Sequence, residues 1–316
     1  VNTAEEVETM AGQLAAYGLN LRTDIDPYSE IWTDRPSLPL NKAFIQKMEY
    51  AGESASSKIE RIRLTLGKRA LVLSMLEEVA WTLNLRSSDV EYTPFMLGYA
   101  LITPQRTLLY ICKEKLTAEI EEYLKEEGVE TRPYEAIADD LRTLDIPVIA
   151  QPSKTNHAVY SAIKHPLRME SPVSRMLIFK NATEIKGYRR TMEKDGVAMV
   201  KWIKWTMENV PKGGQTELSL SAKLEAFRAE QPLFKGLSFE SIMGYAHHGA
   251  IVHYDPTPET DIPVKPEGLL LIDSGGQYLD GTTDITRTIP LGPLTWEMKR
   301  DYTLVLKGWI RLGSAV

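Results

Sequence analysis

The sequence predicts an α/β region followed by an α+β region. From residue 41 to about 172, segments with helical and strand periodicity alternate, which is typical of a sheet covered by helices. From 173 to 316, two long helical segments precede a series of strand-like segments, which favours helices lying on one face of an antiparallel sheet. Residues 1–40 read as a helix, a short strand at 19–23 and a proline-rich crossing. We interpret them as the tail of a preceding α/β domain plus a linker.

The α/β region is built from clearly periodic segments. A helix is expected to end near Leu66, and residues 113–128 form a charged amphipathic helix with oppositely charged side chains one turn apart. An aspartate-rich helix precedes the last strand. The strands are expected at 70–75, 97–103, 107–111 and 146–150.

The α+β region has explicit helix start and stop signals. Asn181 is a candidate N-cap for a long helix that ends near Pro211, and Thr216 is a candidate N-cap for the next helix. Trp202 and Trp205 lie three residues apart on one helix face and are predicted to pack in the core. The strands are expected at 238–245, 249–254, 268–273 and 283–289.

Composition excludes several classes of protein. A net charge of −6 gives no basic surface, so nucleic-acid binding is not supported. No apolar run approaches the eighteen or more residues of a membrane span, and no secretory signal opens the chain. A single cysteine excludes an internal disulfide framework. We therefore expect a cytoplasmic protein with neither nucleic-acid nor membrane partners.

The most informative stretch is 268–289, which carries Asp273 and Asp284 eleven residues apart. It reads as an apolar strand ending in an acid, a glycine-rich turn, and a second strand with a second acid. Carboxylate oxygens suit Mg, Ca and Mn and also ligate Zn or Co, so this hairpin is a plausible cradle for divalent cations. Two solvated hairpin acids without a metal are the alternative interpretation.

The pairing register decides whether the two acids can share a site. A direct pair requires a turn centred at 278–279, which we predict because the glycine pair 275–276 makes a bulge or tight bend easy there. The aspartate-glycine dipeptide at 280–281 is a competing turn signal that would place Asp273 opposite Thr288. That register would separate the acids by about 13 Å, whereas metals in a two-metal site lie only about 3.5 to 4 Å apart.

Several collinear segments resemble one enzyme family. IDSGGQYLDGTTDITRT resembles the first metal-ligand motif of pita-bread metallopeptidases, and more narrowly of Xaa-Pro aminopeptidases (aminopeptidase P), with prolidase and creatinase as relatives. The larger, three-domain form of that family is matched by EIWTDRP, EVAWTLNLRSSDVEYTP, VPKGGQTELS and GAIVHYDPTPET. The resemblance implies a creatinase-like α/β domain at 41–172 and the first half of a pita-bread catalytic domain at 173–316.

The resemblance also implies roles for individual residues. Asp273 and Asp284 map onto two of five ligands of a dinuclear metal site, while a His and two Glu belong to later motifs that this chain does not contain. His253 maps onto a catalytic histidine that contacts substrate or the tetrahedral intermediate. Arg86 maps onto a motif on the active-site side, where its guanidinium could bind a peptide carboxylate; a local pair with Asp89 is the alternative.

The implied activity is removal of the N-terminal residue from peptides with proline in second position, using two divalent ions, with Mn favoured and Zn or Co possible. Prolidase, which cleaves Xaa-Pro dipeptides, and a non-catalytic pita-bread binding domain are the alternatives. We expect both ends of the chain to be truncated and the chain alone to be inactive. We also expect a homodimer, or disorder beyond about residue 290, since a half-domain would expose sheet edges. The adjacent His247 and His248 are expected in a loop as bystanders.

Overall fold

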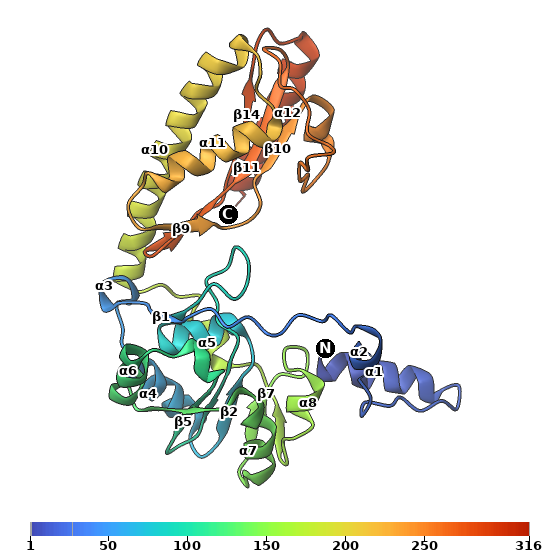
Figure 1. The fold of residues 1–316 in the computed structure, drawn as a ribbon, viewed down its shortest axis with the longest axis vertical. Helices are drawn as coiled ribbons and strands as arrows, with labels where there is room; N and C mark the ends of the chain where they lie inside the picture. Colours follow the sequence, from blue (N-terminus) through green and yellow to red (C-terminus); the bar gives the residue numbers. More distant parts are fainter. Residues whose placement is uncertain (1, 27, 316) are drawn as a thin grey trace. The chain divides into compact units, whose positions relative to one another are not determined.

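The computed structural model describes residues 2–26 and 28–315, which form two compact units, one up to Ile185 and one from Lys186 (Figure 1). In the first unit, helices, 3-10 helices (η) and strands follow in this order: α1 (Ala4–Ala15), α2 (Tyr28–Ile31), β1 (Phe44–Ile45), α3 (Met48–Ala51), α4 (Ala55–Leu66), β2 (Ala70–Leu73), α5 (Leu76–Leu83), β3 (Leu85–Arg86), β4 (Tyr99–Ile102), β5 (Thr107–Tyr110), η1 (Lys113–Lys115), α6 (Ala118–Glu126), β6 (Val129–Arg132), η2 (Tyr134–Ala136), α7 (Ile137–Thr143), β7 (Val148–Ala150), α8 (His157–Tyr160), β8 (Pro166–Arg168) and α9 (Pro172–Met176).

Helix α10 begins just before the boundary between the units. From there the order is α10 (Ala182–Asn209), η3 (Val210–Lys212), α11 (Glu217–Ala229), β9 (Phe234–Leu237), β10 (Ile242–Tyr245), η4 (Ala246–Ala250), β11 (Leu269–Ser274), β12 (Gly276–Tyr278), β13 (Gly281–Thr282), β14 (Ile285–Pro290) and α12 (Trp296–Gly313).

The first unit contains a six-stranded mixed sheet with the order β6-β5-β4-β2-β7-β8. Both faces of this sheet are apolar, because successive side chains of a strand point to opposite sides. In β2, Leu71 and Leu73 pack in the core formed with α4, α5 and α6. Ala70 and Val72 pack in the other core, formed with α1, α7 and α8. A sheet covered by helices on both faces confirms the predicted α/β region.

The sequence boundaries in this unit agree closely with the structure. Helix α4 ends at Leu66 as predicted, and the four predicted strands contain β2, β4, β5 and β7. The strand predicted at 19–23 is wrong, since these residues form no strand. They carry mostly polar side chains at the surface, so the short run offered no apolar face to pair. The division between 1–40 and 41–172 stays a prediction.

The second unit packs α10 and α11 against one side of an antiparallel sheet with the order β10-β11-β14, as Figure 1 shows. A shorter sheet, β13-β12-β9, continues from it. The core lies between helices and sheet and includes Trp202, which is completely buried, while Trp205 packs at its edge. The prediction that both tryptophans pack in a core is confirmed.

Side-chain caps explain where the long helices begin. The Asn181 side chain accepts a hydrogen bond from the Glu184 N–H (2.9 Å), and the Glu184 carboxylate accepts from the Asn181 N–H (2.8 Å). Thr216 caps α11 through the Ser219 N–H (3.2 Å). Each cap satisfies N–H groups that the helix leaves unpaired, so both predicted helix starts are confirmed.

Helix α12 has no buried residue. Its apolar side chains, including Leu304, Val305, Trp309 and Leu312, are exposed, although the helix begins with a regular Thr295 cap. Residues 291–315 form a short connection and a helix. The Thr295 cap and the helical periodicity define this helix locally, and the alternative prediction of disorder beyond about residue 290 stays a prediction.

Candidate metal centre

The two predicted ligands lie on one β-hairpin, in a register that the sequence did not predict. Asp273 of β11 is opposite Thr286 of β14, not opposite Asp284 or Thr288. The same register continues through β12 and β13, where Tyr278 pairs with Gly281. The chain therefore reverses at 279–280, between the two turns that the sequence offered. Asp284 is two residues from Thr286, which makes it the diagonal neighbour of Asp273 on the same face.

This face is the side of the sheet that points away from α10 and α11. In β11, Leu270 and Ile272 are buried in the core beneath the helices, whereas Leu271 and Asp273 are only half-buried. Side chains at i and i+2 share a face, so the two acids project from the half-exposed side. The predicted direct pair is wrong, but its consequence, two carboxylates converging on one face, is found as a diagonal pair.

Gly275 lies between the acids, in the one-residue gap between β11 and β12. A Cβ at this position would lie 2.0 Å from the Thr283 carbonyl oxygen and 2.2 Å from the Ser238 Oγ, so only glycine fits. Next to it, the Gly276 N–H donates to the Thr283 Oγ1 (2.9 Å). This side-chain contact joins the two arms of the hairpin at the gap between the named strands. The predicted bulge or tight bend at 275–276 is not found, because the pairing register runs unbroken from Ser274 to Gln277. The close approach of Gly275 to Thr283 instead keeps the backbone segments that flank both acids together.

The electrostatics of the pair favour a cation. Partial burial, the negative charge of Asp273 and a hydrogen bond between the two carboxyl groups raise the pKa of Asp284. The Oδ1 atom of Asp273 is buried and has no hydrogen-bond partner within the described chain. A divalent cation bound between the carboxylates would take that unpaired oxygen as a ligand and would offset the repulsion between the two negative charges. The pair therefore fits a metal. Within 2–26 and 28–315, no group of three or more His, Cys, Asp or Glu gathers around it.

Buried polar contacts fix the hairpin on the helices. Arg228 of α11 donates to both Asp195 of α10 and the hydroxyl of Ser274, the residue after Asp273 (3.1 Å to Ser274). The Tyr278 hydroxyl donates to the same Asp195 carboxylate (3.0 Å). Thus β11, which carries Asp273, and β12, which carries Tyr278, share one buried anchor.

The hairpin tip has a second anchor on α10. The Asp280 carboxylate accepts from the Thr191 hydroxyl (2.9 Å) and from the Lys194 ammonium group (2.6 Å). Asp280 is 7% exposed, so this is an enclosed contact that fixes the tip. Its role explains why the aspartate-glycine dipeptide at 280–281 did not set the turn: the carboxylate bonds the helix, and the chain reverses one residue earlier.

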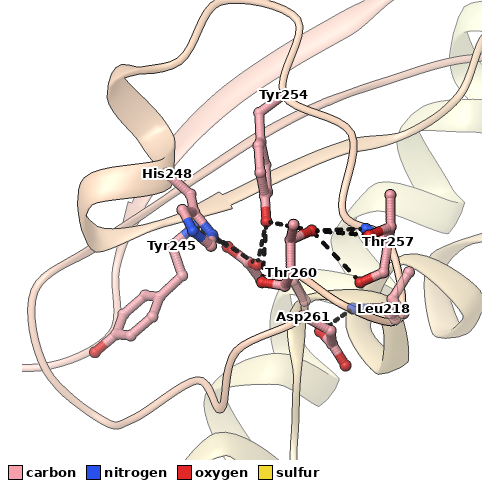
Figure 2. Close-up of polar contacts among 8 residues, drawn as sticks. Leu218, Tyr245, His248, Tyr254, Thr257, Thr260 and Asp261 are labelled. Carbon is pink, nitrogen blue, oxygen red and sulfur yellow. Dashed lines mark hydrogen bonds and ion pairs between the residues drawn. The ribbon is translucent and has the colours of Figure 1, made fainter.

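The segment 246–261 leaves the sheet after β10 and is anchored by Glu217, the first residue of α11 (Figure 2). The Glu217 carboxylate accepts from the Tyr245 N–H (2.8 Å), from the His248 Nδ1–H (2.9 Å to Oε2) and from the Tyr254 hydroxyl (3.1 Å). His248 is 9% exposed and stacks against Tyr254, with ring centroids 4.3 Å apart. Sequence reasoning missed Glu217 altogether, because nothing in a helix-start glutamate signals its distant partners.

His253 lies in this segment but not in the predicted strand. Residues 246–250 form η4 and 251–253 a turn, so the strand predicted at 249–254 is wrong. The His253 side chain is exposed and its backbone is left-handed (φ 57°). His247 and His248 lie in η4 rather than in a strand; the expected bystander role does not hold for His248, which is buried against Glu217.

The segment nevertheless borders the acid face, by which we mean the half-exposed side of the sheet from which Asp273 and Asp284 project. A Cβ on Gly249 of η4 would lie 3.7 Å from the Cβ of Leu271, the half-buried residue on the same face of β11 as Asp273. η4 therefore folds back over the half-exposed side of the sheet. His253 joins no metal-binding cluster of three or more residues in the described chain, and its catalytic role stays a prediction.

Arg86 belongs to the first unit, at the end of β3. Its Nη1 donates to the carbonyl oxygens of Ala80 (2.5 Å) and Leu85 (3.0 Å). Asp89, its alternative partner, accepts from the completely buried Lys115 ammonium group (2.5 Å). Its binding to a substrate carboxylate stays a prediction.

Comparison with known proteins gives consistent matches along the chain. Residues 34–184 match the creatinase/prolidase N-terminal domain, and residues 186–316 match metallopeptidase family M24. A probable Xaa-Pro aminopeptidase P from Laccaria bicolor is 41% identical over 300 residues, which cover 90% of this chain and 46% of that protein. Aminopeptidase P2 from Arabidopsis thaliana is 34% identical over 332 residues, covering 93% of this chain and 47% of that protein.

Solved structures extend the comparison to the fold. An X-prolyl aminopeptidase from Caenorhabditis elegans, described as a cytosolic enzyme with a di-nuclear active site, matches with a TM-score of 0.87 at 27% identity, over 94% of this chain and 51% of that one. A prolidase from Pyrococcus horikoshii matches at 22% identity with a TM-score of 0.60, over 79% and 69% of the chains, which is a likeness of fold. The chain spans about half the length of the curated relatives it matches.

Within the described residues, no helix is long and apolar enough to cross a membrane.

Proposed function

Because the chain belongs to metallopeptidase family M24 and carries a creatinase/prolidase N-terminal domain, we propose that it contributes half of a dinuclear centre for removing the N-terminal residue from Xaa-Pro peptides. The observation that supports this most directly is the diagonal pair Asp273 and Asp284 on the open face of the sheet, with one buried, unpaired oxygen. Structural acids are usually hydrogen-bonded when buried, whereas an unpaired carboxylate oxygen fits a ligand to a cation.

In this proposal Asp273 and Asp284 hold two divalent ions, of which Mn is our choice, with Zn or Co as alternatives. Bound cations would supply Lewis acidity and an activated water. The chain's own contribution is to hold the acids rigidly: the close packing at Gly275 and the buried anchor at Arg228 leave the hairpin little freedom. Rigid placement of ligands is what makes such a site productive.

His253 would act beside the metals by donating a hydrogen bond to the substrate or to the oxyanion that develops on it. Its support is the position of its loop on the acid face, through Gly249 and Leu271. Arg86 would bind a peptide carboxylate by its fork of N–H donors. Small Xaa-Pro peptides are the proposed substrates and a second copy of the chain is the proposed partner, since α12 exposes an apolar face.

The proposal is tested by titrating the chain with Mn²⁺ and following binding by calorimetry. We expect weak binding at the two acids, loss of binding in Asp273→Asn and in Asp284→Asn, and no change in Asp301→Asn, which alters an exposed acid of α12. Equal binding by all four proteins would exclude this site. Because no group of three or more potential metal ligands gathers among the described residues, we expect the 316-residue chain to leave a Xaa-Pro-Xaa tripeptide uncleaved; release of its first residue in the presence of Mn²⁺ would contradict that expectation.

Two other functions remain to be separated. A prolidase would cleave a Xaa-Pro dipeptide and spare the tripeptide, so assaying both substrates in a protein with the complete catalytic domain distinguishes the two activities. A non-catalytic binding domain would keep the fold without needing the acids, and would show no Mn²⁺ binding. Retention of Asp273 and Asp284, converged on one face, favours the peptidase.

A further inference from the structure

Glu217 is the most enclosed carboxylate of the second unit, with no exposed surface. Among the described residues its ion-pair partner is His248, and its other donors are the Tyr245 N–H and the Tyr254 hydroxyl. Burying a carboxylate is costly unless several donors satisfy it, so a group held this way has a specific structural or functional task. The Tyr245 N–H lies at the end of β10, and the His248 and Tyr254 donors come from the segment that follows this strand (Figure 2).

The first turn of α11 is suited to hold this segment. Glu217 is the first residue of the helix, where the exposed N–H groups and the helix dipole favour a negative charge. The next residue, Leu218, donates its N–H to the Asp261 carboxylate (3.1 Å), and the Glu217 N–H donates to the Ile262 carbonyl oxygen (3.4 Å). One helix end therefore binds the segment 246–261 at its start, in its middle and at its end.

The contacts of Glu217 bracket His253 closely. Tyr254 is the next residue and His248 lies five residues earlier, so one carboxylate fixes both sides of the turn that carries the His253 imidazole. The left-handed backbone of His253 costs free energy for a residue with a side chain, and such a conformation persists only where neighbouring contacts enforce it. The contacts of Glu217 on either side provide that enforcement.

We propose that Glu217 is a positioning residue, which sets the place of His253 over the acid face by clamping His248 and Tyr254. The proposal rests on the proposed role of His253. Glu217 itself touches neither Asp273 nor Asp284 in any described contact and acts through the loop. His248 is its chief partner: its Nδ1–H bonds both carboxylate oxygens (3.0 and 2.9 Å), which fixes the orientation of the imidazole ring.

The test is Glu217→Gln in the 316-residue chain. A glutamine keeps the shape but offers one acceptor oxygen, so either the Tyr245 N–H, which bonds Oε1, or the Tyr254 hydroxyl, which bonds Oε2, must face an NH₂ group. The matched control is Glu225→Gln, the same change on the exposed face of the same helix. Amide hydrogen exchange of 246–261 is the first measurement. We expect exchange there to be about tenfold faster or more in Glu217→Gln, with α10 and β11 unchanged and the control like wild type.

Histidine ring signals in two-dimensional ¹H–¹⁵N spectra give a second measurement. If Glu217 had a purely structural role, its substitution would not change the effect of Mn²⁺ on the His253 signal. The chain has five histidines, and His157 and His165 of the first unit serve as internal references. With Mn²⁺ added, paramagnetic broadening of the His253 ring should be strong in wild type and should decrease in Glu217→Gln at matched Mn²⁺ occupancy. The signals of the two reference histidines should be the same in both proteins.

The outcomes are separable from those of the metal proposal. If Mn²⁺ fails to bind wild type, the metal site is wrong, and the exchange data alone decide the role of Glu217. If Glu217→Gln does not fold, Tyr254→Phe, which removes a single hydroxyl donor, replaces it with the same expected direction. Unchanged exchange in 246–261 together with an unchanged His253 signal in a folded variant would overturn the proposal.

Discussion

Asp195 of α10 and Arg228 of α11 form a completely enclosed ion pair, with Oδ1 and Nε 2.7 Å apart and side-chain exposures of 2% and 0%. The same guanidinium reaches Ser274, next to the proposed ligand Asp273. The pair thus connects two helices to the strand that carries one of the acids. Its geometry is two-pronged, since Nη2 also donates to Asp195 Oδ2 (3.2 Å).

Breaking this pair should be strongly destabilising. Arg228→Met leaves the Asp195 carboxylate buried without its charge partner, which costs about 3 to 5 kcal/mol of unfolding free energy. Urea denaturation of the chain measures the loss. The control is Lys201→Met, which breaks the exposed pair with Glu230 (2.8 Å) between α10 and the residue following α11. It should cost at most about 1 kcal/mol. Similar losses in both variants would show that the buried pair has no special role.

Two glycines of α10 should respond to alanine with opposite signs. At Gly187 a Cβ would lie 2.4 Å from the Asp280 carbonyl oxygen at the hairpin tip, so Gly187→Ala forces the helix and hairpin apart. We expect a loss of about 1 to 3 kcal/mol, despite the better helix propensity of alanine. At Gly196 nothing lies within 4 Å, so Gly196→Ala should gain about 0.5 to 1 kcal/mol.

Thermal unfolding of the two glycine variants measures the contrast. Because the Asp280 tip lies between the two acids in sequence, Gly187→Ala should also weaken Mn²⁺ binding, while Gly196→Ala should not. Stabilisation by both substitutions would mean that the tip moves freely over α10, and that the Asp280 anchor does not restrain the hairpin.

Much of the fold could be predicted from local sequence signals. Caps at Asn181 and Thr216, apolar strands such as β2 and β11, and the apolar face of α10 around Trp202 are encoded within a few residues, and the structure confirms them. The pair of acids was found because both lie in one hairpin. Side-chain alternation then restricts them to two faces, so a shared face was within reach of sequence reasoning.

The remaining features depend on contacts between residues far apart in sequence. Neither turn that the sequence offered is used: the chain reverses at 279–280, and the Asp280 carboxylate bonds Thr191, 89 residues away, instead of forming the turn that its dipeptide suggests. The turn around His253 was predicted as a strand because the segment is rich in apolar residues. Its sequence does not reveal that Glu217 holds it against β11. Such long-range polar contacts override local propensity.

Neutralising one acid should stabilise the metal-free chain. The pKa of Asp284 is raised, so the folded chain favours the protonated carboxyl group over the charged one. The free energy of unfolding therefore falls as pH rises through that pKa. Asp284→Asn removes this penalty near neutral pH. We expect a higher melting temperature than wild type in EDTA near pH 7, and no difference at low pH, where Asp284 is protonated. A lower melting temperature in EDTA near pH 7 would show that the carboxylate is favourably paired without metal.

Lys58 should make stability depend on pH in the alkaline range. Lys58 is 1% exposed, and its ammonium group donates to Asn84 Oδ1 (2.7 Å) and the Trp81 carbonyl oxygen (2.8 Å) and lies 4.4 Å from the centroid of the Trp81 ring. Burial, and then the positive charge of Arg86, lower the pKa of Lys58 to about 8. An unfolded lysine titrates near about 10.4, so above pH 8 the unfolded chain binds more protons than the folded one.

Stability therefore rises with pH in the window between these two values. From about pH 7.5 to about pH 9.5, the gain attributable to Lys58 is about 2 kcal/mol. Urea midpoints of wild type and Lys58→Met across this range isolate it, since all other groups titrate in both proteins. The buried tyrosines Tyr110 and Tyr123, whose pKa values are raised, are present in both proteins, so their contribution cancels in the comparison. Parallel curves for the two proteins would mean that Lys58 stays protonated in the fold, held by Asn84 and the Trp81 ring.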